Sequence, residues 1–463
     1  MVKRWMAGGT ATAALLFGTT VAARQVRPAP APAARPAPAP RMPIPVAALL
    51  PGTQALFDGY VKAGTVPGMV GAFATGEGPT LFVAAGRIAD APAAAPAGPD
   101  SLWRVYSMTK PITAMAAMML IEDGKLKLDE PLSTYLPAFA RMRVLTDPEH
   151  TLDSRPATRP ITIRNLLTHT AGLGYTIVNK GPIQQAYEHA GILPFAADAR
   201  TEAKMRAVRP ATLQAFADRV ATLPLIAEPG TRWSYSVGLD VMGAVIEKVS
   251  GVPFDRFVQA RIFRPLGMTS SYWTVPAGDV ARLADAYAAV GAARVAVDPA
   301  ATSVFLRPPS FPYGGAGLVM SARDYDVFLH CLQDGGSLRG ARLLRPETAA
   351  LMMSNLLPAG VVFGGTMTGT MGTGSGNAGP HGYGAGGSVW TEAGPGGHPG
   401  KGTYGWGGAA GTIAYVDPAN RTRGTIMLNL AGGIPGLAGT VRDTLVADGA
   451  RLRAAGAMPT AVH

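Results

Sequence analysis

The chain is poor in the residues that mark several large classes of protein. It has 463 residues and a single cysteine, Cys331, which excludes an intrachain disulfide. This cysteine lies in an apolar, helix-like run and is expected in the core. Only 15% of the residues are charged, and the net charge of +11 comes mostly from scattered arginines. Without a basic run or interleaved aromatic residues, the composition does not favour a nucleic-acid partner.

Several motifs of binding and catalysis are also missing. No serine lies in Gly-x-Ser-x-Gly, which argues against an α/β-hydrolase. The glycine-rich stretch 363–411 lacks the Gly-x-x-x-x-Gly-Lys-Ser/Thr phosphate cradle, and its part 364–379 is predicted to be a mobile surface loop. His381 and His398 lack the spacing of a zinc site. We therefore predict no metal and no organic cofactor.

The first 45 residues have the composition of an export signal and a tether. Residues 1–25 combine Lys3-Arg4 with an apolar stretch that ends in small residues, which predicts a signal peptide. An uncleaved membrane anchor is the alternative. Residues 26–45 are rich in proline and alanine and are predicted to be an extended linker. No later apolar run is long enough to span a bilayer. We expect a periplasmic or secreted protein, with no stable membrane insertion once the signal is removed.

The remaining residues, 46–463, are predicted to form an α+β domain. Strands are expected near both ends, in about 46–106 and 300–463, and a mostly helical section lies between them, in about 107–299. This order predicts one antiparallel sheet flanked by helices, with the helical section inserted. The individual predictions are helices over 49–63, 111–121, 239–249 and 437–455, and strands over 68–74, 79–85, 412–417 and 424–430.

The most informative motif is Ser107-Met-Thr-Lys110, at the start of an apolar helix. Residues i and i+3 share one helix face, so Lys110 is expected to point its amine at the Ser107 hydroxyl and accept its proton. Pro111 fits only the first turn, and Asp123-Gly124 marks the end of the helix. The alternative is a solvated helix start with a chance Ser-x-x-Lys.

Three further segments carry candidate residues. Tyr235 precedes an apolar helix and could share a proton with Ser107 and Lys110; packing at a helix start is the alternative. The glycines of Tyr404-Gly-Trp-Gly-Gly-Ala-Ala-Gly411 would let a strand backbone approach a ligand closely. The alternative interpretation of this segment is a bend in a strand, with Trp406 in the core. His169, in Leu-Thr-His-Thr-Ala-Gly, is interpreted as ordering a loop by bonding backbone carbonyls.

In this order and spacing, the four segments closely resemble the serine β-lactamase and penicillin-recognising superfamily, and most of all the family VIII carboxylesterases. The resemblance covers about residues 46–455 and implies a β-lactamase/transpeptidase-like fold. It implies that Ser107 is the nucleophile, Lys110 its proton acceptor and Tyr235 the proton relay. Backbone N–H groups of Ser107 and Ala409 would form the oxyanion hole. The residues expected to bind substrate are Tyr106, Val237, Trp406, Gly407 and Gly408.

Two departures from the penicillin-recognising pattern bear on specificity. Val237 stands where those proteins carry an asparagine that bonds the substrate amide, and Trp406-Gly-Gly stands where they carry Lys-Thr-Gly. Lys401 lies nearby in the sequence and could partly replace the missing lysine. Both changes replace polar recognition by apolar surface, which suits an ester better than a penicillin.

The sequence therefore predicts a serine hydrolase that cleaves small-molecule esters of short to medium acyl chain through an acyl-enzyme. Alternatives within the fold are a β-lactamase, a D-amino-acid peptidase or amidase, and an acyltransferase. A non-catalytic sensor on a hydrolase scaffold is a further alternative, which the presence of Ser107, Lys110 and Tyr235 disfavours.

Overall fold

The central sheet joins strands from both ends of the described chain. The computed structural model describes residues 46–454, except 194, 196–197, 292 and 365–379. The predicted signal peptide, linker and nearly all of the predicted loop 364–379 lie outside these residues. The sheet has seven strands in the order β12-β13-β14-β15-β16-β1-β2. Their bounds are β1 Gly68–Thr75, β2 Leu81–Gly86, β12 His381–Tyr383, β13 Ser388–Trp390, β14 Tyr404–Gly407, β15 Ile413–Asp417 and β16 Thr422–Met427.

The pairing of β1 with β16 joins the N-terminal hairpin to the C-terminal strands. It is antiparallel like the other pairings within the sheet, with Val70 opposite Met427. Side chains alternate between the two faces of β1. Met69 and Phe73 pack in one apolar cluster with Phe57, whereas Val70 and Ala72 belong to the larger core on the other face.

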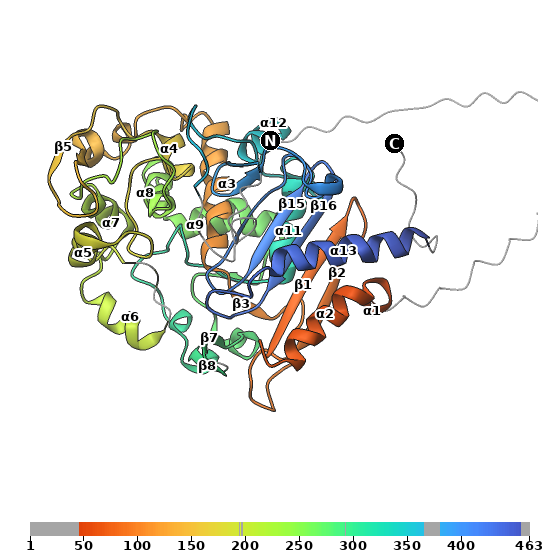
Figure 1. Cartoon of the computed structure of the whole chain (residues 1–463). Coiled ribbons are helices and arrows are strands. Elements are labelled where there is room, and N and C mark those ends of the chain that lie inside the picture. The colour runs from red at the N-terminus through yellow and green to blue at the C-terminus, as the bar shows by residue number, and fades with distance from the viewer. Residues whose placement is uncertain (1–45, 194, 196–197, 292, 365–379, 455–463) are drawn as a thin grey trace, which may run out of the picture. The chain divides into compact units, whose positions relative to one another are not determined.

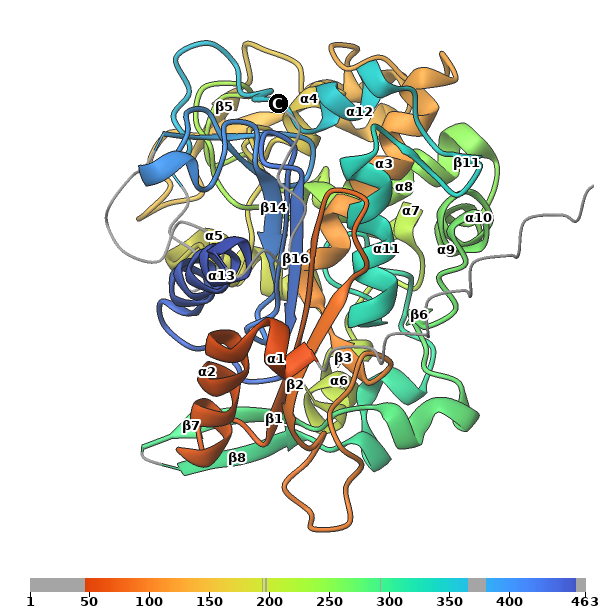
Figure 2. The ribbon, with the colours of Figure 1, turned by 90° about the vertical axis from the view of Figure 1, so that its right-hand side faces the viewer.

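Helices cover both faces of the sheet. α2 (Pro51–Lys62) and α13 (Leu437–Ala454) contact each other and contribute to the smaller cluster. α11 (Ala322–Gln333) packs against β1, β15 and β16 from the larger core. Figure 2 shows this arrangement, with α2 and α13 on one side of the strands and α11 and α3 on the other. The prediction of a helix-flanked antiparallel sheet is confirmed.

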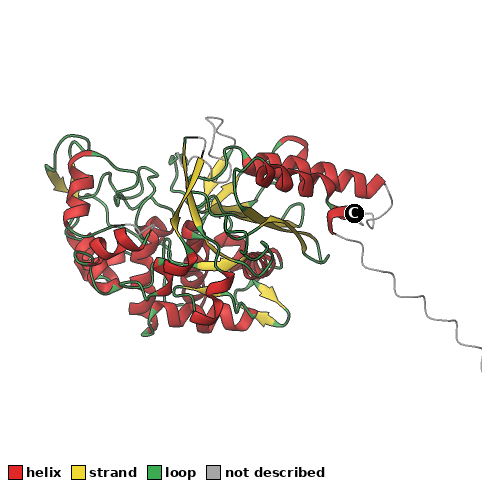
Figure 3. Cartoon of the chain, turned by 90° about the horizontal axis from the view of Figure 1, so that it is seen from below, coloured by secondary structure: helices red, strands yellow, loops and turns green. Residues whose placement is uncertain are grey.

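The middle of the chain is mostly helical and surrounds α3 (Thr109–Glu122), which contacts α8, α9 and α12. Figures 1 and 3 show these helices gathered beside the sheet. The other α-helices of the described residues are α1 Val46–Leu49, α4 Ile163–Leu167, α5 Gly181–His189, α6 Ala199–Arg206, α7 Leu213–Val220, α8 Gly238–Ser250, α9 Phe254–Val258, α10 Arg264–Leu266 and α12 Pro346–Met352.

Short strands also lie between and within the helical parts. β3, β9 and β6 form a three-stranded sheet, and three two-stranded pairs complete the set. Their bounds are β3 Leu102–Arg104, β4 Arg143–Leu145, β5 Ser154–Pro156, β6 Ser271–Tyr272, β7 Ala286–Val290, β8 Ala293–Asp298, β9 Val319–Ser321, β10 Ser337–Leu338 and β11 Ala341–Arg342. These short strands were not individually predicted. Most of them have only two or three residues, which is too few to show an alternation, whereas β7 and β8 have five and six residues and were missed.

Most predicted elements are found close to their expected bounds. The helix predicted over 49–63 is divided, because Leu50 leaves the helical region (φ −125°, ψ 60°) and Pro51 begins a new helix. Cys331 is fully buried in α11, as predicted. In the described part of the chain, no helix has the length and apolarity required to cross a bilayer.

Candidate active site

Ser107 and Lys110 meet where β3 passes into α3. Ser107 is the middle residue of a single 3₁₀ turn, Tyr106–Met108, and Lys110 is the second residue of α3. The Lys110 Nζ donates to the Ser107 Oγ at 3.2 Å, as the i, i+3 spacing predicts. Ser107 is 5% exposed and Lys110 is 1% exposed. Every residue from Thr109 to Leu120 is buried, which confirms a core helix and excludes a solvated helix start.

The residue before the nucleophile candidate has an unusual backbone. Tyr106 has φ 39°, in the left-handed region that side chains other than glycine rarely adopt. Its ring packs edge-on against Phe305, with the centroids 6.2 Å apart. Burial raises the pKa of Tyr106 to about 12, so its hydroxyl stays protonated. The strained turn fixes the direction in which Ser107 leaves β3.

Tyr235 completes the group from a distant part of the sequence. It lies in the segment before α8, and its hydroxyl donates to Ser107 Oγ at 2.8 Å. The Lys110 Nζ lies 4.5 Å from the centroid of the Tyr235 ring, within the range of a cation–π contact. The structure thus brings together the three residues that the sequence analysis singled out.

The end of β14 lies against the strand that leads into Ser107. A Cβ added to Gly408 would lie 2.4 Å from the Val105 carbonyl oxygen, so only glycine fits this close approach. Gly407 ends β14, and Ala409 follows at an exposed position in the turn. The backbone at 408–409 is therefore adjacent to the turn that carries Ser107, where the predicted oxyanion donors need to be.

Trp406 is buried and contacts Tyr235 rather than solvent. Its Nε1 donates to the Tyr235 hydroxyl at 3.4 Å, and the two ring centroids are 5.7 Å apart. Trp233, Tyr383 and Phe363 extend this aromatic group, with Phe363 only partly buried. The surroundings of the Tyr235 hydroxyl are consequently apolar and aromatic.

Two residues that were given no role in the sequence analysis lie directly behind Lys110. The Gly315 carbonyl accepts a hydrogen bond from Lys110 Nζ at 2.7 Å, and the Gly315 N–H donates to Asp240 Oδ1 at 2.8 Å. Asp240 lies in the first turn of α8 and is buried. Burial raises the pKa of its carboxyl to about 6, while the Lys110 ammonium and backbone N–H groups oppose that rise.

His169 supports the segment that carries Tyr235. Its Nδ1 accepts the Ser236 N–H at 3.2 Å, and its carbonyl accepts the Ser234 N–H at 2.9 Å. The sequence analysis expected the His169 ring to bond backbone carbonyls. That detail is wrong, because the ring accepts a backbone N–H instead. Burial, and then the Lys110 charge, holds its pKa well below the usual value. With φ 55°, it occupies a strained loop position and acts as an uncharged spacer.

Val237, which replaces the asparagine of the penicillin-recognising pattern, and Lys401, the suggested substitute for its lysine, lie in different surroundings. Val237 is buried at the N-terminus of α8, and its N–H donates to the Gly174 carbonyl at 3.3 Å. Lys401 is exposed in the turn before β14, at the opposite end of that strand from Gly407. A turn separates Lys401 from the start of β14, so a role for Lys401 in place of the missing lysine stays a prediction.

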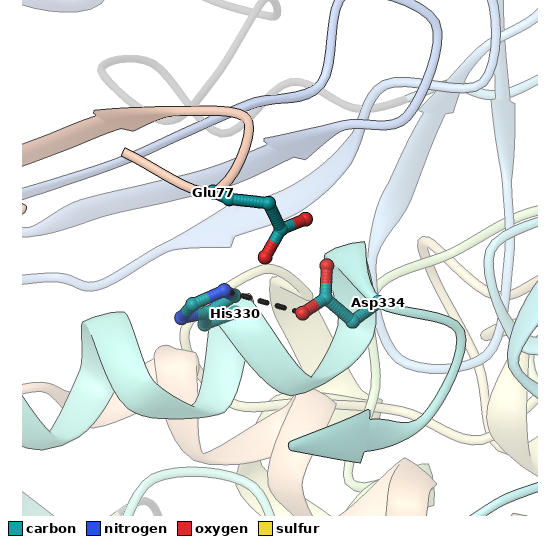
Figure 4. A group of neighbouring side chains, drawn as sticks. All are labelled: Glu77, His330 and Asp334. Carbon is teal, nitrogen blue, oxygen red and sulfur yellow. Dashed lines mark ion pairs between the residues drawn. The ribbon is translucent and has the colours of Figure 1, made fainter. Parts of the chain in front are cut away.

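One group of possible metal ligands occurs among the described residues, away from this site. Glu77, His330 and Asp334 have potential ligand atoms within 4.8 Å of one another (Figure 4). The Arg421 guanidinium already pairs with Glu77 and lies 3.7 Å from Asp334 Oδ1, while His330 Nε2 lies 3.2 Å from Asp334 Oδ2. We interpret the group as a surface ion-pair network, because a cation would have to displace the arginine.

The fold and the Ser-Lys-Tyr group define a β-lactamase-like serine hydrolase. The Beta-lactamase family model matches residues 53–448, and the chain belongs to this family.

Similar proteins include enzymes that act on esters. The lovastatin esterase of Penicillium rubens is 34% identical over 342 residues, which cover 70% of this chain and 78% of the relative. Esterase EstB of Burkholderia gladioli is 33% identical over 291 residues, which cover 60% of this chain and 68% of the relative. The solved structure of EstCE1, described as a hydrolase with promiscuous acyltransferase activity, matches with TM-score 0.66 and 25% identity, covering 86% of this chain and 99% of that one.

Proposed function

We propose that this protein hydrolyses small-molecule carboxylic esters of short to medium acyl chain through an acyl-enzyme on Ser107, in the manner of the family VIII carboxylesterases. The observation that carries the proposal is the convergence on one atom: Ser107 Oγ accepts hydrogen bonds from both Lys110 Nζ and Tyr235 Oη. A serine hydroxyl becomes a nucleophile when a neighbouring base takes its proton, and these two groups are within reach to do so.

In the first half-reaction, the Lys110 amine in its neutral form accepts the Ser107 proton while Oγ attacks the ester carbonyl. The N–H groups of Ser107 and Ala409 stabilise the resulting oxyanion. Tyr235 then passes a proton to the alcohol oxygen, the carbon–oxygen bond breaks, and the alcohol leaves. Tyr235 recovers a proton from Lys110, and the acyl group remains on Ser107.

In the second half-reaction, Tyr235 and Lys110 take a proton from water as it attacks the acyl carbonyl. The bond to Ser107 Oγ breaks, Oγ regains a proton, and the carboxylic acid is released. Trp406 assists by donating to the Tyr235 hydroxyl, which orients this relay. Tyr106 and the backbone at Gly407 and Gly408 border the substrate on either side of Ser107.

The preference for esters rests on the apolar character of the site. The β-lactamase or D-amino-acid peptidase and amidase alternatives need a polar group for an amide and a cation for a carboxylate. Val237 has an apolar side chain, and Lys401 is exposed at the end of β14 opposite to Gly407. The similarity to the lovastatin esterase and to EstB supports the same preference.

The test is a comparison of turnover of p-nitrophenyl esters and of a chromogenic cephalosporin by residues 46–463, for the wild type and Ser107→Ala. We expect fast ester cleavage, little lactam opening, and loss of both in the Ser107→Ala protein with its fold retained. Dominant lactam or amide cleavage would replace the esterase assignment, and full activity of Ser107→Ala would refute the mechanism.

Acyl transfer is a second candidate, favoured by the similarity to EstCE1. An alcohol in place of water would attack the same acyl-enzyme. Adding increasing alcohol to the ester assay separates the two activities: a transferase forms new ester in proportion to the alcohol, whereas a strict hydrolase releases only acid.

We also propose an exported protein without a nucleic-acid partner. This rests on the signal-like residues 1–25 and on the scattered distribution of the arginines. Cell fractionation with mass spectrometry of the mature N-terminus tests it; recovery of the uncleaved chain in the cytoplasm would contradict it.

A further inference from the structure

Asp240 is a buried carboxyl group that is connected to the candidate base through one residue. Its Oδ1 accepts the N–H of Gly315 at 2.8 Å, and the carbonyl of the same Gly315 accepts from Lys110 Nζ at 2.7 Å. The same glycine therefore contacts both the carboxylate and the lysine amine next to Ser107.

The turn that contains Gly315 is wedged between α3 and α8. Thr113 of α3 donates to the Gly314 carbonyl at 2.6 Å. A Cβ at Gly315 would lie 2.8 Å from Asp240 Oδ2, and one at Gly314 would lie 2.2 Å from the Leu239 carbonyl oxygen. Glycine at both positions lets the backbone approach α8 closely enough for the carboxylate to reach it.

The charge of Asp240 also matters to Lys110. Burial in apolar surroundings disfavours the ionised carboxyl, and the Lys110 ammonium is the charged group that offsets this effect. Tyr175 and Tyr313 also interact with Asp240, and burial keeps both of these hydroxyls protonated. An ionised Asp240 therefore stabilises the ammonium that forms when Lys110 takes the Ser107 proton.

We propose that Asp240 is a positioning residue for nucleophile activation, which orients Lys110 through Gly315 and stabilises its protonated form during acylation. The inference rests on the proposed roles of Ser107 and Lys110. It assigns Asp240 no contact with substrate.

The test measures how fast Ser107 reacts with a fluorophosphonate, alongside kcat and KM for p-nitrophenyl acetate, between pH 5 and 9. In the wild type, both rates should fall as the pH drops through about 6, because protonation removes the negative charge of Asp240. Asp240→Asn keeps an oxygen that can accept the Gly315 N–H but removes the charge. It should lower the phosphonylation rate and kcat about 10- to 100-fold and leave KM nearly unchanged. The fall of both rates near pH 6 should also disappear from the pH profile.

Asp324→Asn is the matched control. Asp324 is also buried, accepts a backbone N–H from Ser270 at 2.6 Å, and has a raised carboxyl pKa, but its hydrogen bonds are to Ser270, Ser271 and its own helix start. It should keep the wild-type rate and pH profile per folded molecule. Asp240→Glu, which retains the charge, should recover part of the rate that Asp240→Asn loses.

The inference is overturned if Asp240→Asn reacts with the probe at the wild-type rate, or if Asp324→Asn loses as much. If Asp240→Asn does not fold, the pH dependence of the wild-type protein is the test. Wild-type rates that do not fall near pH 6 would contradict the proposal. A failure of the proposed function would give other results than a failure of this inference. The Ser107→Ala protein would then still hydrolyse ester, or the fluorophosphonate would label a residue other than Ser107.

Discussion

Buried cations are held in two different ways in this protein. Arg104 and Arg423 are almost fully buried, and each donates from Nε to a carboxylate, Asp298 or Asp326, at 2.8 Å. Lys110 is as deeply buried, yet its near partners are a carbonyl, a hydroxyl and an aromatic ring, and its carboxylate lies one residue further away. A guanidinium stays charged, so it needs a direct counter-charge, whereas neutral partners tolerate an amine that gains and loses a proton.

The largest expected effect comes from removing Lys110. Lys110→Met should lower kcat/KM for a p-nitrophenyl ester about 10⁴-fold, because the group proposed to accept the Ser107 proton is then missing. Steady-state kinetics on protein of verified fold would measure this.

Lys110→Arg sharpens the same point. It keeps a positive charge but cannot release its proton, so the loss of activity should be nearly as large. An active Lys110→Arg enzyme would mean that charge alone, and not proton transfer, is required at this position.

The next effect is on stability. Arg104→Met leaves the buried Asp298 carboxylate without its cation, although Ser303 and Val304 still donate to it, and should lower the free energy of unfolding by about 3–5 kcal/mol. Turnover per folded molecule should change by less than about 2-fold, since Arg104 does not contact Ser107, Lys110 or Tyr235. Urea unfolding and kinetics on the same preparation would measure both.

Arg323→Met is the control for an exposed pair. Arg323 bonds Asp100 at 2.7 Å, but both side chains are about half exposed, so the loss should be about 1 kcal/mol or less. Equal losses for Arg104→Met and Arg323→Met would contradict the distinction between buried and exposed pairs.

A smaller kinetic effect is expected for Tyr235→Phe. It removes one hydroxyl that bonds Ser107 Oγ and accepts from Trp406, and kcat should fall about 10²-fold. Tyr383→Phe is the matched control, because this buried hydroxyl has no hydrogen-bond partner among the described residues. Its kcat should stay within about 3-fold of the wild type. A similar loss in both variants would point to aromatic packing instead of proton relay.

The smallest effect is the pH dependence of stability due to His169. Its pKa is lowered by burial and by Lys110, so the unfolded chain binds this proton more readily. The free energy of unfolding should therefore fall as the pH drops below about 6.5, by up to about 1.4 kcal/mol per pH unit for this group.

His169→Ala should reduce that slope and lower stability overall, while turnover per folded molecule is kept. Denaturant titrations between pH 5 and 7.5 would measure the slope. A selective loss of turnover in folded His169→Ala protein would refute the supporting role.

The sequence was most informative where local spacing determines geometry. The separation of Ser107 and Lys110, with Pro111 and Gly124 bounding α3, predicted which side chains meet, and the strands expected near both ends of the chain predicted the sheet. The contact of Tyr235 with Ser107 could be expected only from the resemblance to a family, because no local pattern joins residues so far apart in the sequence.

Residues that act through the backbone could not be recognised in the same way. Asp240 follows Tyr235 closely in the sequence, but its partner Gly315 belongs to a turn before β9, and a carboxylate-to-backbone hydrogen bond leaves no spacing to detect. The hydrogen bond from Trp406 Nε1 to the Tyr235 hydroxyl was likewise not indicated by any local pattern, and the expected contact of Trp406 with substrate stays a prediction. The boundary between α1 and α2, in contrast, could have been predicted from Pro51, because proline is favoured in the first turn of a helix.

The register of the central sheet has a consequence for biosynthesis. β1 is among the first strands to leave the ribosome, yet its neighbour β16 is the last strand of the sheet, with Val70 paired to Met427. One edge of β1 therefore stays open until almost the whole domain has been translated, and closing the sheet requires ordering a very long loop. During synthesis this unpaired edge of an apolar strand is the part of the domain expected to be most prone to aggregation.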